Sequence, residues 1–284
     1  MSISPERCNS LFRKAERDLL KLSSSQDPEP VHSFRTTARR VQTLLEEFVP
    51  DRSRNQKKLL KLLGRIRKRA GKVRDLDVQL AALRNLKIPQ EPRRKTQLTH
   101  NLIELRAKHE KQLRKVLTKE NIHELRKRLK RTSKEIELKS GIEPLLAARQ
   151  MLGHVDRPAG PLTEDVLHHY RVLVKRARYA AELAPKSADA TEFIVQMKRL
   201  QDAIGDWHDW LCLTQTASAH LGHLQHSSLV AALRNVTGGK FRRAVAAFSA
   251  SPTALSAEPV AASDRARKLG VKTLTITERT DSAA

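Results

Sequence analysis

A pattern of one histidine, one aromatic residue and three basic residues occurs twice in this chain, and this duplication constrains the fold more than any other feature. The first copy is HSFRTTARR at residues 32–40 and the second is HHYRVLVKR at residues 168–176, an offset of 136 residues. A further match follows in the same order, because IRKRAGKVRDLDV at 66–78 aligns with LQDAIGDWHDWLC at 200–212. Two copies with so long a period predict a duplicated unit packed about a pseudo-twofold axis, since a solenoid needs at least three repeats.

The hydrophobic pattern predicts an all-α fold. Apolar residues recur with helical period up to about residue 249, and glycine and proline cluster between the periodic segments. From residue 251 onward the chain has small residues and prolines without a sustained period, which predicts a flexible tail at 251–284. Start and stop signals place the expected helices at about 4–23, 28–48, 53–70, 73–87, 91–131 with a break and a new cap near Asn121, 143–151, 163–184, 187–204, 206–225 and 227–248.

The charge balance indicates a polyanionic partner. The chain has 55 Lys and Arg against 31 Asp and Glu, a formal net charge of +24. Charge alone does not separate DNA, RNA, inorganic polyphosphate and anionic membranes, because all of them release counterions when basic residues bind. Aromatic residues make up only 4% of the chain, so base stacking is disfavoured and recognition of phosphates is favoured.

Cysteine usage and the hydropathy profile predict a soluble cytoplasmic protein. Cys8 and Cys212 are too few and too far apart for a disulfide framework or a zinc module. The N-terminal segment carries charges where a signal peptide has its apolar run, and no apolar stretch is long enough to span a bilayer, so we expect no membrane insertion.

Helical projection places the basic residues of the first copy on one face. At about 100° per residue, Arg35 and Arg39 fall within about 60° of His32. The apolar residues between about 160° and 240° are Phe34, Ala38, Val41, Leu45 and Phe48. The second copy repeats the stripe with His168, Arg171, Lys175 and Arg178. The third helix carries another stripe at Lys61, Arg65, Lys68 and Lys72. A solvated face is the simpler interpretation of any single stripe, but recurrence at matched positions favours a binding surface.

The acidic residues near these stripes have two possible roles. Glu46 and Glu182 each follow their histidine by fourteen residues and are candidates for holding arginines extended, with a plain ion pair within one helix as the alternative. Asp75 and Asp209 follow their glycines by four residues, so we expect them in the first turn of a helix. Capping or orienting an arginine is a better role for them there than acid/base chemistry.

The histidines make poor metal ligands in this pattern. His32 and His168 have cations three and seven residues away and no nearby carboxylates or cysteines. His220, His223 and His226 spread over about 120° of helix, whereas a metal pair favours i, i+4 spacing. We therefore expect no metal and no cofactor.

The repeated motifs resemble those of the conserved histidine α-helical domain, the CHAD family. The matching residues are H-x-x-R-x-x-x-R-R at 32–40, G-x-x-R-D-x-D-V at 71–78 and H-x-x-R-x-x-x-K-R-x-R-Y at 168–179. The resemblance spans roughly residues 5–250 and implies one domain at 1–250 made of two pseudo-twofold-related four-helix-bundle halves, at about 4–140 and 141–250. It also implies a basic surface or pore between the halves that binds inorganic polyphosphate, and association with polyphosphate granules.

We expect a stand-alone domain, because the chain has no room and no acidic repeat for the CYTH-type domain often fused to family members. The resemblance assigns polyphosphate binding to His32, Arg35, Arg39, Arg40, His168, Arg171, Lys175, Arg176 and Arg178. The stripe on the third helix and its counterpart in the second half add Lys61, Arg65, Lys68, Lys72 and Arg199.

The sequence favours a non-enzymatic protein that binds polyphosphate on cytoplasmic granules, with other granule proteins as further partners. A nucleic-acid-binding protein is the alternative, because the same charge and the run HELRKRLKR at 123–131 would bind nucleic acid non-specifically. A polyphosphate or triphosphate hydrolase is a third possibility, built on His32, His168 and the pair Asp75 and Asp209. The chain has no Gly-rich phosphate loop and no G-x-S-x-G motif to support it.

Overall fold

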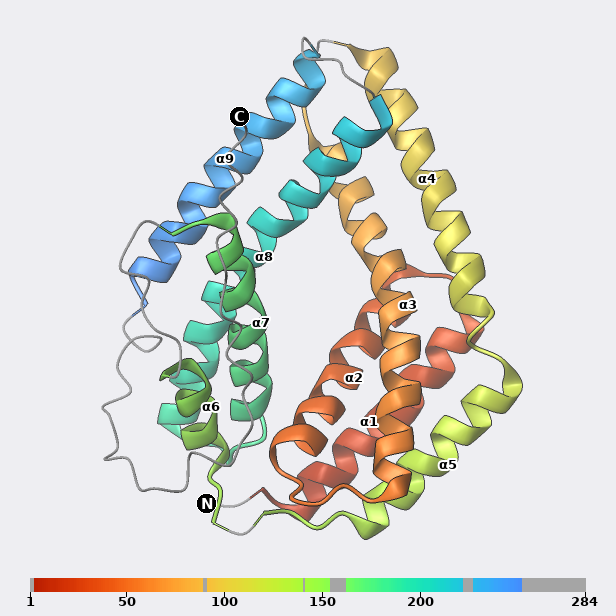
Figure 1. The fold of residues 1–284 in the computed structure, drawn as a ribbon, viewed down its shortest axis with the longest axis vertical. Helices are drawn as coiled ribbons and strands as arrows, with labels where there is room; N and C mark the ends of the chain where they lie inside the picture. Colours follow the sequence, from red (N-terminus) through yellow and green to blue (C-terminus); the bar gives the residue numbers. More distant parts are fainter. Residues whose placement is uncertain (1–2, 89–90, 140, 154–161, 222–226, 252–284) are drawn as a thin grey trace, which may run out of the picture.

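The computed structural model describes residues 3–88, 91–139, 141–153, 162–221 and 227–251, and within these ranges the chain forms nine α-helices and no strand (Figure 1). This confirms the predicted all-α class. The expected tail lies outside the described residues apart from Ser251. The helices are α1 (Pro5–Ser24), α2 (Pro28–Glu47), α3 (Arg54–Asn85), α4 (Pro92–Arg114), α5 (Lys119–Glu135), α6 (Pro144–Gly153), α7 (Glu164–Ala181), α8 (Ala188–Leu221) and α9 (Ser228–Ser249).

Several helices begin where local capping chemistry places them. The Ser4 side chain accepts a hydrogen bond from the backbone of Arg7 at the start of α1. Ser53 and Gln56 form a reciprocal capping box at the start of α3. The expected break before α5 occurs earlier than Asn121, because Thr118 is the residue that caps this helix.

Helices α3 and α8 are continuous, and the predicted breaks beside Gly71 and Gly205 are wrong. Each was expected as two helices, but α3 runs for 32 residues and α8 for 34. A glycine inside a helix costs only about 1 kcal/mol relative to alanine, which tertiary packing on both sides of it can offset. Asp75 and Asp209 therefore lie in helix interiors and not in first turns, so the expected interaction with a helix dipole is absent.

The two long helices join two packed regions. Near the base of Figure 1, α1, α2, α5 and the first part of α3 pack beside α6, α7 and the first part of α8. One continuous apolar cluster fills both groups, and its largest fully buried side chains include Trp207, Tyr170 and Phe34. The second parts of α3 and α8 extend away from this core and pack with α4 and α9 around a separate cluster that includes Leu80, Leu98 and Leu229.

The starts of α4 and α9 meet at the far end of these extensions. Glu91 precedes α4 in the left-handed backbone region, with φ of 54°. Its Oε2 accepts hydrogen bonds from Ser227 Oγ at 2.7 Å and from the Leu229 backbone nitrogen at 3.0 Å. The Glu91 carboxylate therefore accepts hydrogen bonds from donors at the start of α9, and these hydrogen bonds lower the pKa of Glu91.

Reciprocal ion pairs join the two halves at α2 and α7. Arg40 Nε donates to Glu182 Oε2 at 2.6 Å, and Arg176 Nε donates to Glu47 Oε1 at 2.6 Å. Each half therefore supplies one arginine and one glutamate to this contact. The pairs fix α2 beside α7, and this arrangement positions the cavity described next.

Candidate anion-binding site

A cavity of about 480 Å³ lies between α2, α3, α7 and α8. Eight Arg and Lys side chains line it against three Asp side chains, so its wall is strongly positive. The cavity brings together seven of the residues assigned to polyphosphate binding: His32, Arg35, Arg39, Arg40, Arg171, Lys175 and Arg178. Arg74, Asp75, Lys198, Asp202 and Asp209 also line it.

Arg35 and Arg171 occupy matched positions and make matched contacts. Arg35 Nη2 lies 3.5 Å from Asp75 Oδ1, and Arg171 Nη2 lies 3.9 Å from Asp209 Oδ1. Both carboxylates are more exposed than the arginines they face, at 61% and 39%, so water weakens the compensation that they provide. Burial lowers the pKa of Arg35 and so does the positive charge of Arg39, while Asp75 acts in the opposite direction. The two aspartates therefore orient arginines, which is one of the roles predicted for them.

Gly71 allows Arg35 to approach the backbone of α3. A Cβ atom at residue 71 would clash with Nη1 of Arg35, whereas a Cβ at Gly205 would meet nothing within 4 Å. The two halves thus share the glycine but not the contact, and the missing side chain at residue 71 is needed for the position of a site arginine.

Arg39 and Lys175 are two cations of the cavity wall that lack an ion-pair partner among the described residues. Within the described part of the chain, neither has a carboxylate at ion-pair distance. Burial, reinforced by the positive charges of Arg171, Arg39 and Arg35, lowers the pKa of Lys175 to about 7, while Asp209 acts in the opposite direction. Cations held together without anions indicate that the site is built for an anionic ligand.

The two repeated histidines lie at the edge of this cluster. Burial lowers the pKa of His32 and Arg74 lowers it further. Burial also lowers the pKa of His168, whose ring lies 5.2 Å from the ring of His208. His168 does not line the cavity itself. Both side chains are exposed, so a bound anion can reach them and favour their charged form.

Three of the assigned arginines are held by glutamates. Glu182 accepts hydrogen bonds from both Arg40 and Arg178, and Arg176 pairs with Glu47. Glu182 therefore combines the two roles predicted for it, because it pairs with Arg178 in its own helix and holds an arginine of the other half. Glu46 accepts a hydrogen bond from Gln42 and has no arginine at ion-pair distance among the described residues, although its charge acts to raise the pKa of Arg67.

The remaining assigned residues lie outside the cavity. The stripe of Lys61, Arg65, Lys68 and Lys72 is exposed and lies about 110° around α3 from the cavity-lining face. Arg65 Nη2 donates to Asn121 of α5 at 3.1 Å, which shows the direction in which the stripe faces. Arg199 is also exposed and does not line the cavity.

Sequence reasoning missed two arginines of α3. Arg74 lines the cavity. Burial lowers the pKa of Arg67, and the nearby positive charges of Arg39 and Arg35 lower it further. The Arg67 Nε is buried without a hydrogen-bond partner. The spacing in the sequence could have shown them: Arg67 comes four residues before Gly71 and Arg74 comes three residues after it, and this spacing places all three residues on one face of α3.

The structure gives no metal site within the residues it describes, where no three histidine, cysteine or acidic side chains are arranged to hold an ion. His223 and His226 lie outside those residues. Within the same ranges, no helix combines the length and the apolar character needed to cross a bilayer.

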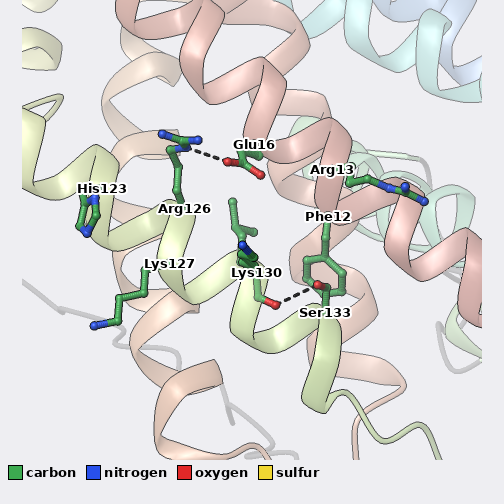
Figure 2. Close-up of a pocket in the computed structure, with 9 residues that line it drawn as sticks. Phe12, Arg13, Glu16, His123, Arg126, Lys127, Lys130 and Ser133 are labelled. Carbon is green, nitrogen blue, oxygen red and sulfur yellow. Dashed lines mark hydrogen bonds and ion pairs between the residues drawn. The ribbon is translucent and has the colours of Figure 1, made fainter.

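A second hollow, of about 580 Å³, lies between α1 and α5 (Figure 2). Arg13, Arg126, Lys127 and Lys130 line it, together with Glu16. Figure 2 shows Arg126 turned toward Glu16, and their hydrogen bond measures 2.7 Å. This hollow belongs to one half of the chain and part of its charge is compensated, so it is the weaker anion site.

Comparisons with known proteins agree with the resemblance inferred from the motifs. The family model of the CHAD domain matches residues 7–218, a range that contains the whole wall of the cavity. The curated proteins give no match to this chain. The fold is similar to that of PptA from Streptomyces chartreusis, with a TM-score of 0.61 and 15% identity over 89% of this chain and 99% of that chain. It is also similar to the CHAD domain from the plant Ricinus communis, with a TM-score of 0.57 and 16% identity over 88% of this chain and 87% of that chain. Because the family model matches well over half of the sequence, the chain belongs to the CHAD domain family.

Proposed function

We propose that this protein binds inorganic polyphosphate in the cavity between α2, α3, α7 and α8, as a binding protein and not as a hydrolase. The observation that carries the proposal is the wall of the cavity, where Arg39 and Lys175 lie among further arginines without a carboxylate at ion-pair distance in the described residues. Phosphate oxygens would supply the missing negative charge, and guanidinium groups bind them through paired, charge-assisted hydrogen bonds.

The wall of the cavity favours a polyanion without bases. Among the described residues, the rings that line it are those of His32 and Tyr179, and Tyr179 is 5% exposed and lies beneath the guanidinium groups of Arg178 and Arg40. His32 is therefore the one exposed ring in this wall, which is few for base stacking, on which most proteins that bind single-stranded nucleic acid depend. A linear chain of phosphates has no bases to stack, so it fits this wall better.

The basic run on α5 gives the nucleic-acid alternative less support than its sequence suggests. Arg126, Arg128 and Arg131 each pair with a glutamate, so a large part of the charge of this run is already compensated. The run also lies at the α1–α5 hollow, away from the cavity. We therefore place binding in the cavity and treat nucleic acid as a competitor to be tested.

Charge reversal in the cavity tests the proposal directly. The combined substitutions Arg35→Glu, Arg39→Glu, Arg171→Glu and Lys175→Glu should abolish retention on immobilised polyphosphate while circular dichroism shows unchanged helicity. A matched control reverses four exposed cations elsewhere: Lys57, Lys87, Lys186 and Arg234. Retention of the cavity variant equal to that of the control would contradict the proposal.

A third variant separates the cavity from the outer stripe of α3. Lys61→Glu, Lys68→Glu and Lys72→Glu should leave the affinity for short polyphosphate chains unchanged, because these residues do not line the cavity. A loss as large as that of the cavity variant would move the binding surface to the stripe.

Competition and product analysis separate the remaining alternatives. Duplex DNA and RNA, added at equal phosphate concentration, should fail to displace polyphosphate. Release of phosphate from polyphosphate with Mg²⁺, lost on His32→Ala, would instead indicate a hydrolase. Imaging in cells tests the location. A fluorescent fusion of the protein should gather on polyphosphate granules, and it should become diffuse in cells that cannot synthesise polyphosphate.

A further inference from the structure

Lys175 differs from the other lysine of the cavity in its surroundings. The Lys198 Nζ lies 2.6 Å from Asp202 Oδ2 and its side chain is 63% exposed. Lys175 is half-buried, and in the described residues no carboxylate lies at ion-pair distance from it. It stands where the first copy of the repeat has Arg39, and a guanidinium does not lose its proton in a protein. At this matched position, only the second copy of the repeat therefore places an ionisable amine in the cavity wall.

This amine is a nucleophile at neutral pH. Its pKa of about 7 leaves roughly half of it uncharged at pH 7. An exposed lysine, with a pKa of about 10.4, is uncharged to less than about 0.1% at the same pH. Burial beside other cations is a known way to activate a lysine for attack on a carbonyl group.

The neighbours of Lys175 provide a binding site for a phosphate leaving group. Arg35, Arg39 and Arg171 face the same cavity and are close enough to influence the charge of the amine. A small molecule that carries both a phosphate and a reactive carbonyl would be held by these arginines with its carbonyl beside the amine. Acyl phosphates combine the two groups in one molecule.

We propose that Lys175 is a modification site, acylated by acyl phosphates that the surrounding arginines hold, and that this acylation weakens polyphosphate binding. The lone pair of the Lys175 nitrogen forms a bond to the carbonyl carbon, and the bond from that carbon to the phosphate oxygen breaks. Inorganic phosphate leaves with the bonding electrons, and the nitrogen loses its extra proton to solvent. The product is an uncharged amide in the cavity wall. The effect on binding rests on the proposed function, whereas the modification itself does not.

Acetyl phosphate and the purified full-length protein test the modification. Mass spectrometry of peptides should show Lys175 acetylated about tenfold or more faster than Lys198 at pH 7, because of the larger uncharged fraction. The rate at Lys175 should level off above about pH 7. Equal rates at the two lysines would overturn the proposal.

A reagent without phosphate tests the role of the arginines. The acetyl ester of N-hydroxysuccinimide reacts with amines but offers no phosphate to the cavity. The ratio of labelling at Lys175 to that at Lys198 should be higher with acetyl phosphate, and inorganic phosphate should lower it toward the ratio found with the ester. The same ratio with both reagents would overturn docking by the arginines.

The effect on binding has its own outcomes. Acetylated wild-type protein and Lys175→Gln should both bind polyphosphate more weakly than untreated protein. The Lys175→Arg variant cannot form the amide at this position. Treatment with acetyl phosphate should therefore leave the affinity of this variant for polyphosphate the same as before treatment. Undiminished binding by the acetylated protein would overturn the regulatory effect. If untreated protein binds no polyphosphate, the proposed function fails, and labelling at Lys175 still decides whether the residue is modified.

Discussion

Gly71 is the residue at which the backbone of α3 and the side chain of Arg35 come together. The guanidinium occupies the space that a Cβ atom would fill, so Arg35 is held against a helix and aimed at the cavity without a strong ion pair. This contact belongs to residues from two different elements. The sequence pattern showed the glycine and the arginine, but only the packing of α2 on α3 shows that one makes room for the other.

We expect Gly71→Ala to weaken polyphosphate binding by about tenfold or more, because loss of one charge-assisted contact costs about 1.5–3 kcal/mol. Stability should change little, since the gain in helix propensity is offset by displacement of Arg35. Gly205→Ala is the matched control: it meets no neighbour and should raise stability by about 0.5–1 kcal/mol without changing affinity. Titration of fluorescent polyphosphate and urea unfolding measure the two quantities, and equal binding by the two variants would contradict the prediction.

Lys175 should give the proposed polyphosphate binding a dependence on pH. The charges of Arg171, Arg39 and Arg35 disfavour the ammonium form of Lys175, whereas Asp209 favours it, and a bound phosphate would favour it in the same way. At any pH where the amine of the free protein is neutral, binding is therefore accompanied by uptake of a proton. Affinity should be highest below pH 7 and fall as the pH rises through about 7, by at most about tenfold per pH unit for one proton. Isothermal titration in buffers of different ionisation enthalpy measures the proton uptake. Lys175→Arg should lose the part of the dependence between pH 7 and 9.

The same lysine opposes folding when no ligand is present. Its pKa is lower in the folded protein than in the unfolded chain, so stability should rise as the pH rises from about 7 to about 10. Lys175→Met removes the buried charge and should stabilise the ligand-free protein by about 1–4 kcal/mol at pH 6, with a smaller gain at pH 9. Thermal unfolding at the two pH values measures this change, and an equal gain at both would contradict it.

At the scale of elements, Glu182 should matter more to stability than Glu47. Glu182 compensates Arg40 and Arg178 together, and the Arg178 side chain is only 11% exposed. Glu47 pairs with Arg176, which is 48% exposed and can turn to water. We expect Glu182→Gln to cost about 1–3 kcal/mol and Glu47→Gln less than about 1 kcal/mol. Urea unfolding of the two variants tests this order, and equal losses would argue against it.

The helices themselves were largely predictable, and the exceptions share a physical cause. Periodicity and caps located most elements, because both signals are local. The false breaks at Gly71 and Gly205 came from applying a local rule where tertiary packing decides. Of the site, the repeated stripes predicted the cavity residues from α2 and α7. They could not show that Arg40 and Arg176 join the two halves, because their glutamate partners come from the other half.

At the scale of the whole molecule, the closure of the α3 and α8 extensions could not be foreseen. The contact between Glu91 and Ser227 joins residues far apart in the sequence, and neither belongs to a recognisable motif. The separate apolar cluster beneath it draws on four helices. The predicted pseudo-twofold axis would relate α2 to α7 and α4 to α9, which would explain why the members of each pair meet. This relation remains a prediction.

The proposed binding should depend steeply on salt, because several cations of the cavity would each neutralise a phosphate. The logarithm of the association constant should fall linearly with the logarithm of salt concentration, by about 0.7 for each phosphate neutralised on a single strand. Lys175→Gln should make this slope shallower by about that amount, whereas Lys186→Gln, on the exposed surface, should leave it unchanged. Affinity that is independent of salt would rule out an electrostatic site.

The uncompensated cations between α2 and α7 have a consequence for how long the protein persists. Their mutual repulsion is present whenever the cavity holds no anion, and a ligand that binds only the folded state removes it. Protein without ligand therefore visits the unfolded state more often, where proteases degrade it. If the proposed function holds, its half-life in a cell should rise and fall with the supply of polyphosphate, so that abundance follows the ligand without any change in synthesis.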